Sequence, residues 1–185
     1  RGGKLLGVVH RDISPSNVLV GEHGQVKLAD FGIAKAAGAS HHTKTGMLKG
    51  KIPYMPPEYI VGGPYDARGD LFALGVTLFE CLAGRRPFDG ARDVDTLHRI
   101  TVGERARLAD LAPGAPEPLV RAVESLLSVD PALRPKTARA FVAMLADVAP
   151  PASTRARLAD AVTRIVEARA PREAPNEERT AHRTA

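Results

Sequence analysis

Two short β-type runs near the start of the chain predict a small β-hairpin. Two β-type apolar runs, 18–20 and 26–28, flank the segment 21–25 (Gly-Glu-His-Gly-Gln), which is rich in turn-forming residues. Residues 33–57 show no clean period and contain Gly, Ser, Thr, His and Pro, so we expect a long loop there. Loops of that length in compact domains are usually functional or disordered.

From residue 66 onward the pattern becomes helical. Residues 66–84 are apolar nearly all round, which predicts a buried helix that ends at Gly84. We expect Cys81, inside this run, to be a small buried residue. Weaker helical patterns follow near 93–102, 117–128 and 137–148, and a loop at 128–135 separates the last two.

The dipeptide Pro150–Pro151 marks a boundary between a folded domain at 1–150 and a tail at 151–185. Ser153 is placed to cap a helix in the tail. The apolar residues that share one face of this helix are Leu158, Val162, Ile165 and Val166. The helix is either a marginal tail helix or a partner-binding one, and we expect 171–185 to be disordered.

Composition narrows the class of protein. The net charge of +5 is diffuse: seven Arg and five acids give +2 in the tail, and 19 basic against 16 acidic residues give +3 elsewhere. Without a long basic run, we expect no nucleic-acid partner. Trp is absent and aromatic residues make up only 4%, so we expect an aliphatic core.

Three features of the sequence suggest where the protein is located. The longest apolar stretch, 71–84, is too short to span a bilayer and contains Glu80, so we expect no membrane segment. No signal-peptide pattern occurs at the start. A single cysteine fits a reducing compartment, and together these features predict a cytoplasmic protein.

Three oxygen-bearing side chains are spaced as phosphoryl transfer from a nucleotide requires. Such a reaction needs a carboxylate for the attacking hydroxyl and further oxygen ligands that hold Mg²⁺ against the phosphates. Asp12 and Asn17 lie five residues apart on one predicted loop, and Asp30 follows the hairpin. Folding the hairpin back would bring Asp30 near the other two, so ATP and Mg²⁺ are the expected ligands.

At these residues the sequence resembles a known family. His-Arg-Asp followed by Asn (10–17), then Asp-Phe-Gly (30–32), then Pro-Pro-Glu (56–58) have the order and spacing of eukaryotic-type protein serine/threonine kinases, here of a bacterial-like kind. The resemblance covers roughly 5–147, all of it C-terminal lobe. It implies a mainly α fold, the helical C-terminal lobe of a protein kinase, with a small β-hairpin at the active-site edge.

The resemblance also implies catalytic roles for individual residues. Asp12 matches the base that accepts the proton of the substrate hydroxyl. Asn17 and Asp30 match the ligands that hold Mg²⁺ on the phosphates of ATP, and Leu19 matches the residue under the adenine. Arg11 matches the arginine that pairs with a phosphorylated activation loop, whose hydroxyl candidates here are Ser40, Thr43 and Thr45.

Further matches are structural rather than chemical. Glu58 and Arg134 match a buried ion pair between the activation segment and the helical base. Asp70 matches a helix residue that hydrogen-bonds the backbone of the catalytic loop. His41 and His42 have no Cys/His partners elsewhere, so we interpret them as a surface pair and not a metal site.

The chain departs from the family at two positions that we expect to be neighbours. Serine/threonine kinases usually carry a Lys, in contact with the transferring phosphate, where this chain has Ser14. They usually carry Thr where this chain has Lys51, after Gly50. We hypothesise that the Lys51 ammonium compensates for the missing lysine, which makes Lys51 a third catalytic residue. Alternatively, Lys51 faces solvent and the site is weakened.

The functional prediction is a protein serine/threonine kinase that phosphorylates protein substrates. Only nine residues precede His10, without a Gly-rich phosphate loop, so we expect a partner lobe, the kinase N-terminal lobe, upstream. Three alternatives remain: an inactive, pseudokinase-like scaffold, a small-molecule phosphotransferase, and a tyrosine kinase. The last is disfavoured because Pro15 follows the serine/threonine pattern.

Overall fold

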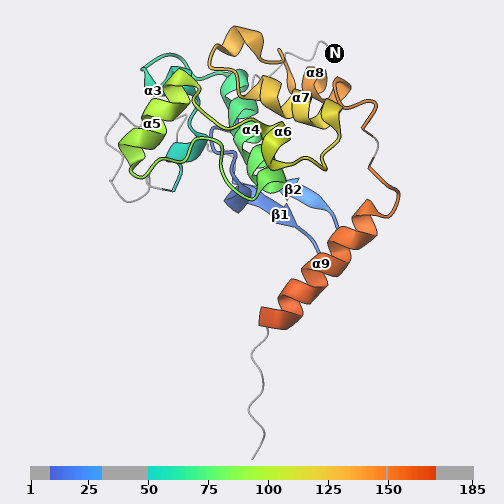
Figure 1. Ribbon diagram of the computed structural model, residues 1–185. Helices are drawn as coiled ribbons and strands as arrows, with labels where there is room; N and C mark the ends of the chain where they lie inside the picture. The colour runs from blue at the N-terminus through green and yellow to red at the C-terminus, as the bar shows by residue number, and fades with distance from the viewer. Residues whose placement is uncertain (1–8, 31–49, 149, 170–185) are drawn as a thin grey trace, which may run out of the picture. The chain divides into compact units, whose positions relative to one another are not determined.

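One long helix, α4 (Ala67–Ala83), lies at the centre of the helical lobe in the computed structural model, which describes residues 9–30, 50–148 and 150–169 (Figure 1). Asp66 caps its start, because the side-chain Oδ1 accepts a 2.7 Å hydrogen bond from the backbone N–H of Arg68. Gly84, at a φ of 70°, ends it in the left-handed conformation that glycine adopts without steric cost. The buried helix predicted over 66–84 is confirmed.

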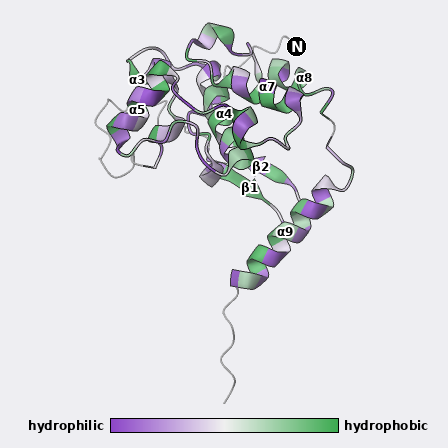
Figure 2. Ribbon diagram, in the orientation of Figure 1, coloured by the Kyte–Doolittle hydropathy of each residue, from purple (hydrophilic) through white to green (hydrophobic). Residues whose placement is uncertain are grey.

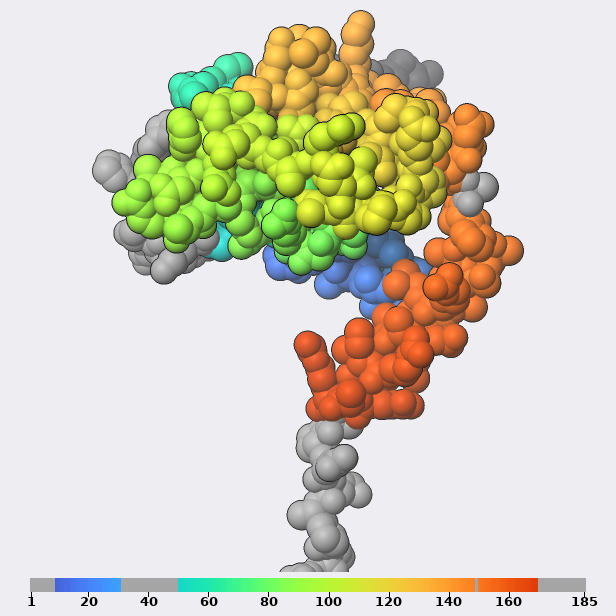
Figure 3. Space-filling model, in the orientation of Figure 1, coloured from blue at the N-terminus to red at the C-terminus, as the bar shows by residue number. Residues whose placement is uncertain are grey.

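Shorter helices pack around α4. They are α3 (Pro57–Ile60), α5 (Asp93–Val102), α6 (Leu108–Leu111), α7 (Glu117–Leu126) and α8 (Ala138–Ala143), with 3₁₀ turns η1 (Pro15–Asn17), η2 (Ile52–Tyr54) and η3 (Pro131–Leu133). Helices α6 and α7 pack on α4, while α5 packs on α3 and η2. In the space-filling view, residues of α6 and α7 cover part of α4 on the face shown (Figure 3).

A glycine allows α4 to pack closely against the end of α7. A Cβ atom at Gly75 would lie 2.7 Å from Cβ of Leu126 and 3.0 Å from Cδ2 of Leu127. Real Cβ atoms do not come that close to a neighbouring carbon, so the two helices can pack at this distance only without a side chain at position 75.

The core is aromatic as well as aliphatic, so the expectation of an aliphatic core is wrong. Phe72, Phe79 and Phe88 are fully buried, and Phe141 is 5% exposed. The rings of Phe72 and Phe88 stack with centroids 5.7 Å apart. The chain has only five phenylalanines, and the composition gave their number but not their location: four of them lie in the core.

The structure corrects several predicted boundaries. Helix α8 ends at Ala143, earlier than the predicted 137–148, and α6 and α3 were not predicted. The described end of the expected loop at 33–57 holds η2 and the start of α3. Cys81 is exposed and not buried, since an apolar helix packed on one side still leaves other positions facing solvent.

The predicted hairpin is confirmed. Strands β1 (Val18–Val20) and β2 (Val26–Leu28) pair in a two-stranded sheet. Strand β1 is coloured as hydrophobic in Figure 2, and β2 has apolar residues on either side of Lys27, yet Leu19 is 55% and Val26 59% exposed. The pairing uses backbone groups on one side of each strand, while much of the apolar surface of Leu19 and Val26 is left uncovered by the described part of the chain.

The hairpin tip, Val20–Val26, and the described residues from Pro151 to Arg169 belong to a second compact unit. It contains α9 (Thr154–Arg169), where the sequence predicted a tail helix. A Cβ atom at Gly24, whose φ is 71°, would lie 2.2 Å from the carbonyl oxygen of Arg155, so glycine permits this contact. The domain boundary near residue 150 stays a prediction, and the predicted disorder of 171–185 falls outside the described residues.

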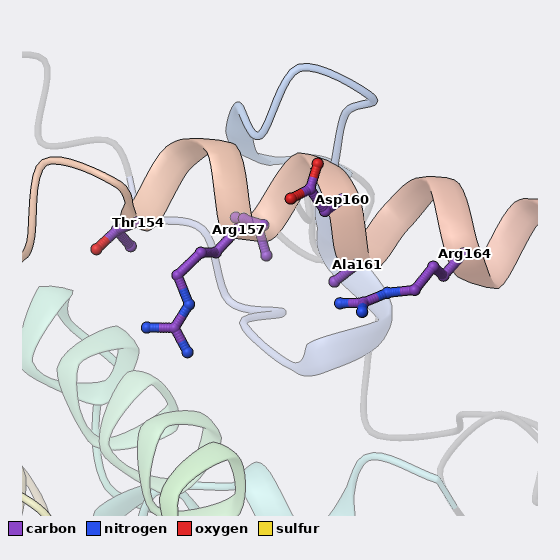
Figure 4. A pocket seen from close by; sticks show the side chains of 6 residues that line it. Thr154, Arg157, Asp160, Ala161 and Arg164 are labelled. Carbon is purple, nitrogen blue, oxygen red and sulfur yellow. The ribbon is translucent and has the colours of Figure 1, made fainter.

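A shallow depression lies on the surface of α9 (Figure 4). Residues of α9 alone line it: Thr154, Arg157, Leu158, Asp160, Ala161 and Arg164. It contains none of the predicted catalytic residues.

Among the helices of the described ranges, none combines the length and apolar character needed to cross a bilayer.

Candidate active site

The catalytic loop, residues 10–17, brings Asp12 and Asn17 into contact. Pro15 starts the 3₁₀ turn η1, and the backbone N–H of Asn17 donates to the carbonyl of Ser14 at 3.0 Å. The Asn17 amide Nδ2 then donates to the Asp12 carbonyl oxygen at 2.7 Å and to its carboxylate Oδ2 at 3.1 Å. Because the amide nitrogen is used in this way, the side-chain oxygen is the Asn17 atom suited to a cation.

Asp70 fixes the start of this loop from helix α4. Its Oδ2 accepts from the backbone N–H of His10 at 2.6 Å, and its Oδ1 accepts from that of Arg11 at 2.8 Å. These bonds confirm the contact expected of Asp70. Tyr65, which the sequence analysis did not single out, donates its hydroxyl to the same Oδ1 at 3.0 Å. Burial, and secondly the Asp70 carboxylate, raise the pKa of Tyr65, so its hydroxyl stays a donor.

Two residues of the site have a left-handed backbone. The φ angles are 63° at Arg11 and 57° at Asp30. This conformation costs a non-glycine residue about 1–2 kcal/mol, and such strain concentrates at functional sites. At Arg11, the two Asp70 bonds and a stacking contact over the Tyr65 ring, 5.9 Å from guanidinium carbon to centroid, help to hold it.

The end of β2 is bound to the catalytic loop just before Asp30. The backbone N–H of Ala29 donates to the Asn17 carbonyl at 2.8 Å. His10 Nε2 donates to the Ala29 carbonyl at 3.1 Å. Folding back of the hairpin therefore places the residue before Asp30 against the loop that carries Asp12, as the sequence predicted. Phe31 and Gly32 fall outside the described residues.

Lys51 lies against Asp12. Its ammonium Nζ forms an ion pair with Asp12 Oδ2, the same oxygen that accepts from Asn17. The turn that carries it is anchored, because Ile52 and Pro53 are buried and the Tyr54 hydroxyl donates to Glu80 Oε2 at 2.6 Å. The hypothesis that Lys51 faces solvent away from the site is therefore not favoured by the geometry. Neither Tyr54 nor Glu80 was singled out from the sequence.

Ser14 occupies the place where the family usually has lysine. The residue is 5% exposed, and its hydroxyl shares a 2.9 Å hydrogen bond with that of Ser16. No residue between Asp12 and Asn17 carries a charge. The residues between Asp12 and Asn17 therefore supply no cation, and the guanidinium of Arg11, directly before Asp12, lies over the Tyr65 ring.

Glu58 and Arg134 form the predicted ion pair. Two parallel bonds join them, Nη1 to Oε1 at 2.8 Å and Nη2 to Oε2 at 2.7 Å. The Arg134 side chain is fully buried, and its guanidinium lies 5.0 Å from the centroid of the Phe72 ring. This pair ties the start of α3 to the core of the helical lobe.

The residues present fit a magnesium ion held jointly with phosphates. Asn17 offers an amide oxygen and Asp30 a carboxylate, which are hard oxygen donors. The described ranges contain no cluster of three or more His, Cys, Asp or Glu side chains suited to a metal. Mg²⁺ does not need one, since it commonly takes one or two carboxylates and completes its shell with phosphates and water.

Several predictions fall on residues outside the described ranges. They are the phosphorylation candidates Ser40, Thr43 and Thr45, and the pair His41 and His42. The phosphate-pairing role of Arg11 depends on those hydroxyls and stays a prediction. Leu19, predicted to lie under adenine, is on β1 with 55% of its surface exposed.

Comparison with known proteins identifies the family. The family described as "Protein kinase domain" matches residues 5–144. The chain belongs to the protein kinase family. The match includes the catalytic loop, Asp30, the Glu58–Arg134 pair and helices α3 to α7, so it covers the whole candidate site.

Bacterial kinases are among the similar proteins. The tyrosine-protein kinase MasK of Myxococcus xanthus is 45% identical over 139 residues, 75% of this chain and 22% of that protein. The serine/threonine-protein kinases PknA and PknL of Mycobacterium tuberculosis are 38% and 34% identical, each over 77% of this chain and over 32% and 36% of their own lengths. The chain thus spans between about a fifth and a third of these relatives.

Proposed function

We propose that this chain forms the catalytic and substrate-binding lobe of a protein serine/threonine kinase that uses ATP and Mg²⁺. The observation that carries the proposal is the convergence of Asp12, Asn17 and the residue before Asp30 through direct hydrogen bonds. Together with Asp30, which directly follows Ala29, the side chains of Asp12 and Asn17 would supply one base and two cation ligands, the groups that phosphoryl transfer requires.

The proposed reaction transfers the γ-phosphoryl group to a protein hydroxyl. The hydroxyl oxygen attacks phosphorus and forms a new P–O bond. The bond from phosphorus to the bridging oxygen breaks, and its electron pair stays with ADP. Asp12 accepts the hydroxyl proton, and the Asn17 bond to Oδ2 holds the carboxylate in place. A magnesium ion held by Asn17 and Asp30 would neutralise charge on the phosphates.

The proposal also specifies which amino acid accepts the phosphate, namely serine or threonine. Two relatives bear serine/threonine kinase names, and Pro15 in the catalytic loop follows that pattern. The relative of 45% identity, MasK, bears a tyrosine kinase name, which makes tyrosine the second candidate acceptor. Phosphoamino-acid analysis of the product separates the two.

The proposal includes a nucleotide-binding N-terminal lobe as a partner. Leu19 and Leu28 on the hairpin are 55% and 39% exposed, apolar side chains suited to contact a purine base and a packed lobe. The competing function is a scaffold that docks partners through the helical lobe without turnover.

The test uses one polypeptide in which a kinase N-terminal lobe precedes this chain. We expect it to transfer phosphate from labelled ATP to a mixed Ser, Thr and Tyr peptide library. The Asp12→Asn variant should lose transfer by at least about 100-fold and still bind Mg·ATP. Asp110→Asn, an exposed aspartate on α6, is the matched control. Mg·ATP binding without any transfer by the parent would favour the scaffold.

A further inference from the structure

We propose that Lys51 is the cation that stabilises the transferring phosphoryl group, delivered by the turn at η2 and not by the catalytic loop. The inference deepens the proposed kinase function and rests on it. It starts from a contact: Lys51 Nζ is paired with Asp12 Oδ2, an oxygen of the proposed catalytic base.

Phosphoryl transfer requires positive charge beside the base. Negative charge spreads over the phosphoryl oxygens in the transition state, and catalysis consists largely of positioning and electrostatic stabilisation. The four residues between Asp12 and Asn17 carry no charge, and Ser14 is buried with its hydroxyl bonded to Ser16. Arg11, on the other side of Asp12, holds its guanidinium over the Tyr65 ring, so the cation for this stretch is expected from another segment.

The geometry of Lys51 suits this role. An ammonium group has three donor hydrogens. Within the described residues its hydrogen-bond and ion-pair partner is Asp12, so donors remain for phosphoryl oxygens. The Lys51 side chain is 38% exposed and that of Asp12 13%, so the lysine of this pair remains partly accessible to a substrate.

The position of Lys51 is fixed by packing. Ile52 and Pro53 are buried directly after it, and Tyr54 is bonded to Glu80 on α4. A merely solvated surface lysine would not need such an anchored turn or a contact with the base. Preorganisation of this kind is what makes an electrostatic contribution to catalysis large.

The first test compares Lys51→Met and Lys51→Arg in the polypeptide that joins a kinase N-terminal lobe to this chain. Met keeps the length of the side chain without its charge, and we expect a fall in kcat of about 100-fold or more with KM for ATP changed less than about threefold. Arg keeps the charge and should retain more activity than Met. Lys136→Met, an exposed lysine before α8, is the matched control.

A binding measurement separates this role from a structural one. Mg·ADP with aluminium fluoride mimics the transferring phosphoryl group, and transition-state mimics bind through the interactions that accelerate the reaction. Lys51→Met should bind Mg·ADP as the parent does and lose about 100-fold in affinity for the aluminium fluoride complex. Equal losses for both ligands, or for neither, would overturn the proposal.

Chemical restoration of the charge gives a second, independent readout. Lys51→Cys is made in a Cys81→Ser background, because Cys81 is exposed and would also react, and the added lobe is chosen without cysteine. Alkylation with 2-bromoethylamine rebuilds an ammonium at position 51 and should restore turnover at least tenfold. Alkylation with iodoacetamide adds a neutral group and should not. Equal rates after both reagents would overturn the proposal.

Failure of this inference is distinguishable from failure of the kinase proposal. A parent that transfers no phosphate contradicts the proposed function itself. A parent that transfers phosphate, loses it in Asp12→Asn and keeps it in a folded Lys51→Met contradicts only the role of Lys51. Thermal melting of each variant against Lys136→Met establishes that it is folded.

Discussion

Arg134 binds Glu58 through two parallel hydrogen bonds across 76 residues of sequence. The same guanidinium donates to the carbonyls of Ser128 at 2.8 Å and Arg68 at 2.9 Å. One side chain therefore joins the start of α3, the start of α4 and the connection after α7. All three nitrogens of the buried Arg134 guanidinium donate hydrogen bonds, which explains how its positive charge is accommodated in the core.

Removing Arg134 should strongly destabilise the helical lobe. Arg134→Met leaves the Glu58 carboxylate mostly buried without its partner, and we expect the free energy of unfolding to fall by about 3–5 kcal/mol. Urea denaturation of the chain measures this, with the exposed Arg139→Met on α8 as control. Arg134→Met with Glu58→Leu should lose less than the sum of the single changes. A loss under about 1 kcal/mol for Arg134→Met, typical of surface pairs, would contradict the assignment.

Asp70→Asn should loosen the catalytic loop. The carboxylate receives the backbone N–H groups of His10 and Arg11 on different oxygens, whereas an amide offers only one acceptor. We expect faster hydrogen exchange at one of these amides and a loss of about 1.5–3 kcal/mol in stability, the usual contribution of bonds to charged groups. Asp110→Asn is the control for charge alone. Unchanged exchange at both amides would contradict the described contacts.

Gly75→Ala should destabilise the packing of α4 on α7. The added methyl would lie 2.7 Å from Cβ of Leu126, so the helices must separate or the Leu126 and Leu127 side chains must shift. Overpacking of this kind costs about 1–3 kcal/mol, more than the gain in helix propensity. Ala156→Gly, at an exposed position of α9, gives a helix-propensity effect without a core contact. A more stable Gly75→Ala protein would show that the gap is wider than described.

Stability should fall at high pH because of two tyrosines. Burial raises the pKa of Tyr65 and of Tyr54, with the bonded carboxylates of Asp70 and Glu80 adding to the effect. A group whose pKa is raised by folding stabilises below its unfolded pKa, about 10 for tyrosine, and that contribution is lost as pH rises above it. The absorbance of ionised tyrosine should therefore appear for Tyr65 and Tyr54 only at a pH above that at which exposed tyrosines ionise. Tyr65→Phe should flatten the loss of stability above pH 10, and an early ionisation of Tyr65 would contradict its burial.

Local rules were sufficient to predict much of the fold. The predicted strands coincide with β1 and β2, and Asp66 and Gly84 mark the ends of α4 as capping rules require. The core was harder to predict, because composition counts phenylalanines without locating them. Cys81 was misjudged for a related reason: α4 is apolar nearly all round, so its sequence does not show which side faces the solvent.

The residues of the candidate site could be predicted from the sequence, but the residues that hold them in position could not. The residues Asp12, Asn17 and Lys51 were found from motifs, and the structure brings them together. Tyr65 and the Tyr54–Glu80 bond were missed, because each joins segments that come together only in the folded chain. In the sequence, Tyr65 is one tyrosine before the helix cap at Asp66, and nothing there indicates that its hydroxyl will hydrogen-bond Asp70.

The most direct test of the account is phosphate transfer by this chain in one polypeptide with a kinase N-terminal lobe, compared with its Asp12→Asn variant. Both proteins are given labelled Mg·ATP and the mixed peptide library, and the labelled amino acid is identified. The account predicts phosphoserine or phosphothreonine from the parent and at least about 100-fold less from the folded variant. Equal transfer by both proteins, or none from a parent that binds Mg·ATP, would contradict it.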